Sequence, residues 1–239
     1  MTTLADSGGV AAPLPPPLIP LKGLRGSIAR NMTAGWAAPR VAMGVDVDMS
    51  RCQTVLTRLQ AGAVPGTRIT VTALVLRAAA LALREHPRLN ALMREGGIER
   101  MHDVNLGFAV TLGDGLAVPV IRQADLKPVA ALAAEINELA AGARAGTLPP
   151  RAYQSGTFTL SNLGATGIDW FTPILNPPQV GILGLSRVAE RAVVRDGQVV
   201  VAPMTTLTLV FDHRAVDGHP AALFLRCLRK RLEGAESLL

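Results

Sequence analysis

Hydrophobic residues recur every three or four positions in several segments of the chain, the spacing of helices that bury one face. From Leu21 onward, Leu24, Ile28 and Met32 lie four residues apart and predict the first helix. The same spacing predicts four more helices: about 49–61, Thr70 as N-cap to His86 before Pro87, Pro128 to near Gly146, and a C-terminal segment with Ala222, Leu225, Leu228 and Leu232 facing inward.

Other segments alternate between apolar and polar or small residues, which is the period of a half-buried strand. In the segment 41–48, Ala42, Gly44 and Asp46 alternate with larger apolar residues, so one side of this strand is expected to face solvent or a partner. Asp114-Gly115 and Asp196-Gly197 each predict a hairpin. The segments GTFTLSN, QVGILGLS and TTLTLVFDH predict further strands.

The order of these elements lacks a regular alternation of strands and helices, which argues against a Rossmann fold or a TIM barrel. We therefore predict an α/β (α+β) fold, a two-layer sandwich in which a mixed β-sheet is flanked by helices. The chain has 239 residues and 49% hydrophobic content, enough for one domain, predicted over residues 21–239. Residues 1–20 are rich in Pro, Gly and Ala and are expected to form a linker or disordered tail.

The formal charge of +6 favours ligands that carry phosphate, but the basic residues are spread along the chain. Only five Phe, two Trp and one Tyr are present, so a surface for stacking nucleic-acid bases is not expected. No apolar run reaches the roughly 20 residues of a membrane span, and the N-terminus lacks the features of a signal peptide. We expect a soluble intracellular protein that binds neither nucleic acid nor membrane.

The two cysteines and three of the four histidines show no pattern that indicates catalysis or metal binding. Cys52 and Cys227 form neither a disulfide framework nor a metal-binding motif, so both are expected to be small buried side chains, and no metal is predicted. His86 is expected to be a cation at a helix end, and His102 a solvated loop residue. His219 either supports the neighbouring motif or has no functional role.

That motif is Asp212-His213-Arg214-Ala215-Val216-Asp217-Gly218, which follows a predicted strand and precedes the last helix. His213 accepts a proton near neutral pH and is held at a strand end, where it is both rigid and reachable. The sequence shows no protein nucleophile beside it, so a thiol of the substrate is expected to fill that role. Asp217 follows four residues later.

The run DHRAVDG resembles the signature of the 2-oxo acid dehydrogenase acyltransferases. Three further blocks occur in the family's order: LKGLRGSIARNM, then DGLAVPVIRQADLKPVAALAAEI, then GTFTLSNLG with GIDWFTPILNPPQVGILGL. The resemblance covers about residues 20–239. It implies a fold like that of chloramphenicol acetyltransferase, homotrimers with active sites between subunits, and possible assembly into a larger core in which Leu238-Leu239 joins trimers.

The resemblance also implies an activity, acyl transfer between dihydrolipoamide and coenzyme A, and a role for each catalytic residue. His213 would take the proton from the attacking thiol, and Ser161 would donate a hydrogen bond to the tetrahedral oxyanion. Asp217 would orient the loop that carries His213, with Arg25 as a candidate partner. The residues that bind coenzyme A are left unassigned because the chain has 21 arginines.

Family members also carry a lipoyl domain, which does not fit upstream of residue 20. The lipoyl group is therefore expected from another segment or chain, and dehydrogenase components of the complex are expected partners. Asn162-Leu163-Gly164 stands where the succinyl-transferring branch usually has NGG, which favours an acetyl or branched-chain acyl group. The excess of arginine over lysine suggests a bacterial cytoplasm; in a eukaryote the location would be the mitochondrial matrix.

Two alternative functions remain open from the sequence. One is a stand-alone acetyltransferase for a small-molecule acceptor, although aromatic residues that would line a pocket for a flat acceptor make up only 3% of the chain. The other is a non-catalytic assembly scaffold, against which the joint presence of His213, Asp217 and Ser161 argues.

Overall fold

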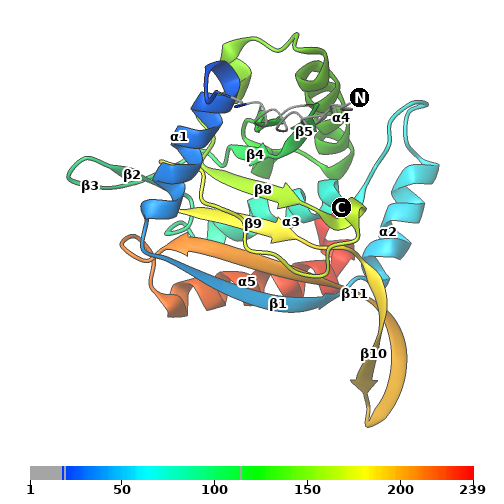
Figure 1. Ribbon diagram of the computed structural model, residues 1–239. Helices are drawn as coiled ribbons and strands as arrows, with labels where there is room; N and C mark the ends of the chain where they lie inside the picture. The colour runs from blue at the N-terminus through cyan, green and yellow to red at the C-terminus, as the bar shows by residue number, and fades with distance from the viewer. Residues whose placement is uncertain (1–17, 19, 114) are drawn as a thin grey trace, which may run out of the picture.

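The computed structural model describes residue 18, residues 20–113 and residues 115–239. Most of the predicted tail, residues 1–20, therefore lies outside the described residues, as does Asp114 of the first predicted hairpin. Within the described part, a seven-stranded sheet forms the centre of the molecule (Figure 1). Its strands follow the order β1-β11-β9-β8-β4-β7, and β10 pairs with β11.

All five predicted helices are present in the described residues. They are α1 (Gly23–Ala37), α2 (Ser50–Ala61), α3 (Val71–Glu85), α4 (Val129–Ala145) and α5 (Gly218–Glu233). Thr70 is the N-cap of α3, as predicted, and His86 is its C-cap. The prediction for α5 is wrong at one position. Ala222 was expected to face inward but is exposed, and Ala221 packs inward instead.

The strands combine parallel and antiparallel pairing, which confirms the predicted mixed sheet. They are β1 (Arg40–Asp48), β2 (Ala91–Arg94), β3 (Gly97–Arg100), β4 (Leu106–Phe108), β5 (Val110–Leu112), β6 (Gly115–Ala117), β7 (Val120–Ile121), β8 (Phe158–Asn162), β9 (Gly181–Leu185), β10 (Ala189–Arg195) and β11 (Gln198–Asp212). β4, β8 and β9 run parallel to one another. β1 has the predicted exposed side, because Ala42, Gly44 and Asp46 are all exposed.

The segment 105–121 differs from the single hairpin that the sequence predicts. β5 and β6 form a separate two-stranded sheet, whereas β4 and β7 belong to the central sheet. Pro119 explains part of this break, because it accepts a hydrogen bond from the Phe108 amide but has no amide proton to donate. The Ala109 amide instead donates to Leu160 of β8.

Two other features of the sheet differ from the prediction. The hairpin of β2 and β3, which turns at Gly96 with a φ of +80°, was not predicted. The hairpin at Asp196-Gly197 is present, but its second strand continues without interruption into the predicted strand 205–213. β11 is therefore one strand of 15 residues that pairs with β10, β1 and β9 along its length.

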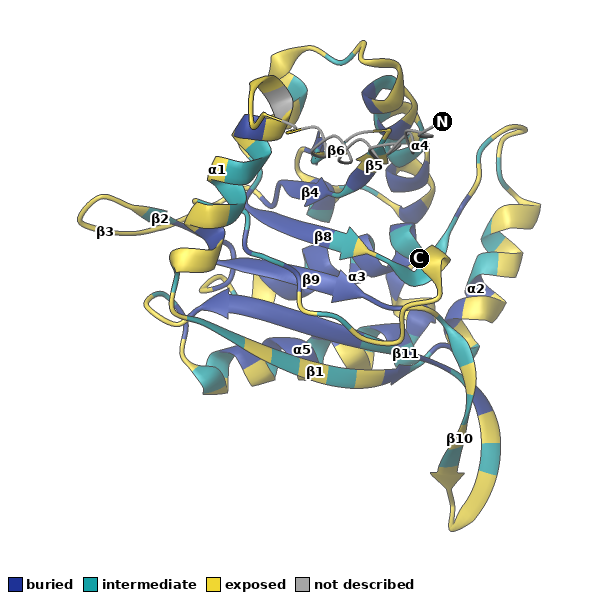
Figure 2. Ribbon diagram, viewed as in Figure 1, coloured by how far each residue is buried: buried dark blue, intermediate teal, exposed yellow. Residues whose placement is uncertain are grey.

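The core lies between the sheet and the helices α3 and α5, which cover one of its faces (Figure 1). Five buried alanines on α3 (Ala73, Ala78, Ala79, Ala80 and Ala82) leave room for close packing. Phe158 of β8 packs against Phe224 of α5, with ring centroids 5.9 Å apart. Figure 2 shows that the middle of the sheet is buried while the β10–β11 arm projects into solvent.

Leu238 and Leu239 were predicted to join trimers, but only one of these two side chains is exposed. Leu238 is fully buried in the core of its own chain, and only Leu239, 52% exposed, is available to a neighbour. Among the described residues, helices long and apolar enough to cross a membrane are absent.

Candidate active site

His213 follows the last residue of β11 and is held there by its backbone. Its amide donates a hydrogen bond to the carbonyl of Pro39 at 2.9 Å, and its ring lies 5.7 Å from the ring of Phe211. The side chain itself is 46% exposed. The imidazole is therefore carried on a fixed backbone but remains accessible to a ligand, as the sequence predicts.

Asp212, directly before His213, fixes the conformation of this turn. Its carboxylate is 2% exposed and binds Arg214 in a fork, with distances of 3.0 Å from Nε to Oδ1 and 2.6 Å from Nη2 to Oδ2. The Arg214 amide also donates to Oδ1 at 3.0 Å. The hydrogen bond and the charge of Asp212 raise the pKa of Arg214. Such a two-point contact has a defined geometry and is stronger than a neutral hydrogen bond.

Sequence reasoning assigned no role to Asp212 or Arg214. The signal was available, because an acid and an arginine flank the candidate base and the acid ends an apolar strand. What the sequence did not reveal is that the side chains fold back onto each other across His213.

Asp217 is the N-cap residue of α5 and lies close to His213. One carboxylate oxygen is 3.9 Å from Nδ1 of His213, which is too far for a hydrogen bond. The Asp217 side chain is 76% exposed. Its predicted pairing with Arg25 stays a prediction.

Ser161 lies near the end of β8, beside a cavity of about 250 Å³ between α1, β6, β8 and β9. Apolar side chains form most of the wall, among them Ile28, Met32, Leu116, Val118, Ile174 and Ile182. Within the described residues, the Ser161 hydroxyl has no hydrogen-bond partner, so its proton is available to a ligand.

A chain of polar side chains lines the same region. Asn31 of α1 donates to Asn176 at 2.8 Å, the Asn176 amide reaches Thr159 at 3.5 Å, and Thr159 donates to the buried Gln179 at 2.6 Å. These contacts join α1 to β8 and to the segment before β9. They hold the cavity wall around Ser161 in place.

Ser161 and His213 lie at opposite ends of the central sheet. Ser161 is opposite Gly184 of β9, which in turn is opposite Thr208 of β11. His213 lies five residues beyond Thr208, about 17 Å further along the strand, and two strand spacings of about 5 Å separate β8 from β11. Side chains this far apart cannot contact one carbonyl group within a single chain.

The predictions for the other histidines and for the two cysteines are confirmed only in part. His102 is an exposed loop residue, as predicted, and His219 is exposed in the first turn of α5. His86 ends α3 as predicted, but burial lowers its pKa, which favours the uncharged imidazole over the predicted cation. Cys52 is buried, and burial raises its pKa to about 12. Cys227 is only half buried, contrary to prediction.

Groups that could hold a metal ion do not include the motif residues. In the described ranges, one set of at least three His, Cys, Asp or Glu side chains is close enough, namely Glu85, His86 and Cys227 between α3 and α5. His213, Asp217 and Ser161 are not members of it. The imidazole of His213 can transfer a proton, and the Ser161 hydroxyl at the other end of the sheet can donate a hydrogen bond.

Comparison with known proteins identifies close relatives of this chain. Residues 16–239 match the family model described as 2-oxoacid dehydrogenases acyltransferase (catalytic domain). The sequence is 40% identical to the dihydrolipoyllysine-residue acetyltransferase component of the acetoin cleaving system of Bacillus subtilis, over 92% of this chain and 56% of the relative. The chain thus spans about half the length of the curated relatives it matches.

Solved structures show the same fold. A dihydrolipoamide acetyltransferase of Azotobacter vinelandii has a TM-score of 0.88 and 34% identity, covering 95% of this chain and 99% of that one. The cubic core of a pyruvate dehydrogenase multienzyme complex has a TM-score of 0.88 and 35% identity, with the same coverage. A chloramphenicol acetyltransferase (TM-score 0.55, 14% identity, 85% of this chain and 94% of that one) shares the fold alone.

Because Arg214 binds the buried carboxylate of Asp212, replacing this exposed side chain should destabilise the protein more than replacing an ordinary surface arginine. Arg214→Ala should lower the free energy of unfolding by about 1.5–3 kcal/mol, because it leaves a buried carboxylate without its charged partner. Arg51→Ala is the matched control, since Arg51 only meets Glu236 at 3.7 Å on the surface and should cost less than about 1 kcal/mol. Urea unfolding measures both values; equal costs would contradict the role given to the fork.

Proposed function

This chain belongs to the 2-oxoacid dehydrogenase acyltransferase family, and we propose that it transfers an acyl group between dihydrolipoamide and coenzyme A. The observation that carries the proposal is the placement of His213 and Ser161 on a fold of this family, at opposite ends of one sheet. His213 lies past one end of β11 with a 46% exposed side chain, Ser161 lines a cavity near the other end of the sheet, and each would supply one half of what thioester exchange requires. Two copies of the chain would complete the site.

A site shared between two subunits would let Ser161 of one chain and His213 of another act on the same substrate. If one subunit places its β8 end beside the β11 end of the next, Ser161 and the partner's imidazole converge on one channel. The exposed side of β1, with Ala42, Gly44 and Asp46, offers small residues suited to close approach by a second chain. Cyclic symmetry would repeat the contact, and a homotrimer is the assembly we propose. The similarity to a cubic core supports a larger multimer built from such trimers.

The reaction follows from the properties of these two side chains. His213 takes the proton from the thiol of dihydrolipoamide or coenzyme A, and the resulting thiolate attacks the carbonyl carbon of the partner thioester. Ser161 of the neighbouring subunit donates its hydroxyl proton in a hydrogen bond to the tetrahedral oxyanion. When the intermediate collapses, the carbon–sulfur bond to the departing thiolate breaks. The imidazolium returns its proton to that sulfur.

The Azotobacter vinelandii relative supports these assignments. Its structure is described as an investigation of the roles of a serine, a histidine and an asparagine in the catalytic mechanism. There the serine precedes the histidine by 52 positions and the asparagine follows it by four. Ser161, His213 and Asp217 have the same separations, so an aspartate stands where that relative has an asparagine. We propose that Asp217 orients the loop of His213 through its contact with Nδ1.

The acyl group we propose is acetyl or a branched-chain acyl group. The relatives named as acetyltransferases favour acetyl, and a cavity of about 250 Å³ beside Ser161 leaves room for a short aliphatic group. The lipoyl group would be supplied by a lipoyl domain on another segment or chain, and dehydrogenase components would be partners. The bacterial relatives favour a cytoplasmic location. The likeness to chloramphenicol acetyltransferase concerns the fold and does not favour a small-molecule acceptor.

His213→Ala should abolish acyl transfer and leave the fold intact, because the lost group is the base and its side chain is 46% exposed rather than part of the core. Transfer from acetyl-coenzyme A and other acyl-coenzyme A esters to dihydrolipoamide measures the activity. His102→Ala, in an exposed loop, is the matched control and should retain full turnover. A folded His213→Ala protein with near wild-type turnover would disprove the mechanism.

Ser161→Ala should lower kcat by about 10²-fold with little change in KM, because the hydroxyl contacts the oxyanion mainly in the transition state. Steady-state kinetics with both substrates separate the two parameters. Ser237→Ala, which removes only a local hydrogen bond to Gly234, should change neither of them. A rise in KM alone would make Ser161 a residue of substrate binding.

Mixed variants test whether the active site is shared. His213→Ala and Ser161→Ala chains, mixed in equal amounts with subunit exchange, should form about one quarter of their sites with both intact residues. Activity should therefore reappear, while each separate variant stays inactive or slow. If mass analysis verifies exchange and activity does not recover, both residues act within one chain.

A further inference from the structure

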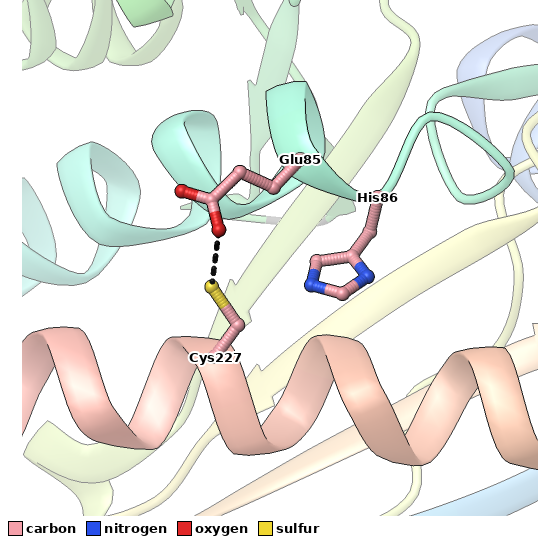
Figure 3. A group of neighbouring side chains, drawn as sticks. All are labelled: Glu85, His86 and Cys227. Carbon is pink, nitrogen blue, oxygen red and sulfur yellow. Dashed lines mark hydrogen bonds between the residues drawn. The ribbon is translucent and has the colours of Figure 1, made fainter.

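Glu85, His86 and Cys227 form a compact cluster between two helices that includes none of the motif residues. Glu85 is the last residue of α3, His86 is its C-cap, and Cys227 lies in the middle of α5. One ligand atom from each of the three side chains lies within 4.8 Å of the other two. Figure 3 shows the carboxylate and the thiol facing each other, with the imidazole beside them.

The distances in this cluster resemble those around a tetrahedral zinc ion. Bonds of about 2.0–2.3 Å to zinc at tetrahedral angles place neighbouring ligand atoms about 3.3–3.6 Å apart. Cys227 Sγ is 3.4 Å from Glu85 Oε2, within that range. The remaining separations are at most 4.8 Å, so the imidazole would shift toward the other two ligands when an ion binds.

The surroundings prepare two of the three ligands. Arg231 binds Oε1 of Glu85, which leaves Oε2 directed at the thiol. Phe224 contacts the His86 ring edge-on, with centroids 6.1 Å apart. Across the described part of the chain, neither ring nitrogen of His86 has a hydrogen-bond partner.

We propose that Glu85, His86 and Cys227 bind one zinc ion, with water as the fourth ligand. Binding would deprotonate the Cys227 thiol and release that proton to solvent, since the thiolate is the ligand. Thiolate and carboxylate together balance the charge of Zn²⁺, and the imidazole is neutral. The cations on this side of the cluster, Arg226 and Arg231, oppose binding, although Arg231 already shares its charge with Glu85. The ion would connect the end of α3 to α5.

Cobalt(II) is the probe for this site because its spectrum reports both thiolate ligation and tetrahedral geometry. Metal-free full-length protein titrated with Co²⁺ should develop a thiolate-to-metal charge-transfer band and intense visible bands. One equivalent of Zn²⁺ per chain should remove them. Zinc should also raise the Tm of the wild-type protein.

Variants distinguish this site from others on the surface. Cys227→Ser should eliminate the charge-transfer band and weaken zinc binding by at least about 100-fold, since even outer-shell changes cost about 10–100-fold. His86→Gln should also weaken binding at least about 10-fold. Cys52→Ser is the matched control, because Cys52 is buried in α2 and should leave the band unchanged.

Circular dichroism and acyl transfer by the metal-free proteins check that each variant is folded, because neither His86 nor Cys227 belongs to the proposed catalytic set. His86→Gln alters a half-buried helix end and provides a second test if Cys227→Ser does not fold. A wild-type protein without the charge-transfer band at saturating Co²⁺ would overturn the proposal. Equal zinc affinity in the wild type and in the Cys227→Ser and His86→Gln variants would do so too, because the ion would then bind elsewhere.

Discussion

The position of His213, the proposed catalytic base, depends on one buried carboxylate. Asp212 ends β11, and its amide donates to Val180 before β9, which keeps the strand end within the sheet. Its carbonyl accepts hydrogen bonds from the amides of Ala215 and Val216, so the same residue forms the turn that leads to α5. The fork from Arg214 satisfies its carboxylate. A carboxylate at 2% exposure is tolerated only with such partners, so strand end, turn and helix start are fixed together.

This local rigidity explains why the proposed site needs a second subunit. The turn cannot bring His213 toward Ser161, because both are fixed to the same sheet at positions about 17 Å apart along the strands. The separation belongs to the register of β8, β9 and β11, and no side-chain rotation removes it. In the proposed mechanism, one chain alone would hold the base at one end of the strands and the oxyanion donor at the other. Assembly would bring the two groups from different subunits into one site.

The sequence predicted the elements that have a strong local pattern and missed those set by distant contacts. Helical spacing located α1 to α5, and alternation located β1 with its exposed side. The break between β4 and β5 was missed because it depends on an amide of Ala109 that donates to β8, some 50 residues away. The motif identified His213, but the fork of Asp212 and Arg214 is a matter of side-chain geometry that the letters DHR do not specify. Likewise, Glu85 and His86 meet Cys227 only because α3 packs against α5.

The helical layer behind the sheet connects the turn that carries His213 to the cluster of Glu85, His86 and Cys227. α5 begins at Gly218, directly after the turn that carries His213, and Cys227 lies further along the same helix. Phe224 contacts both Phe158 of β8 and His86, so the core under α5 links the strand of Ser161 to the end of α3. A metal ion between α3 and α5 would restrain α5 about two turns beyond the turn that carries His213. Because Asp212 already fixes that turn independently, such an ion would stabilise the helical layer without being required to position His213.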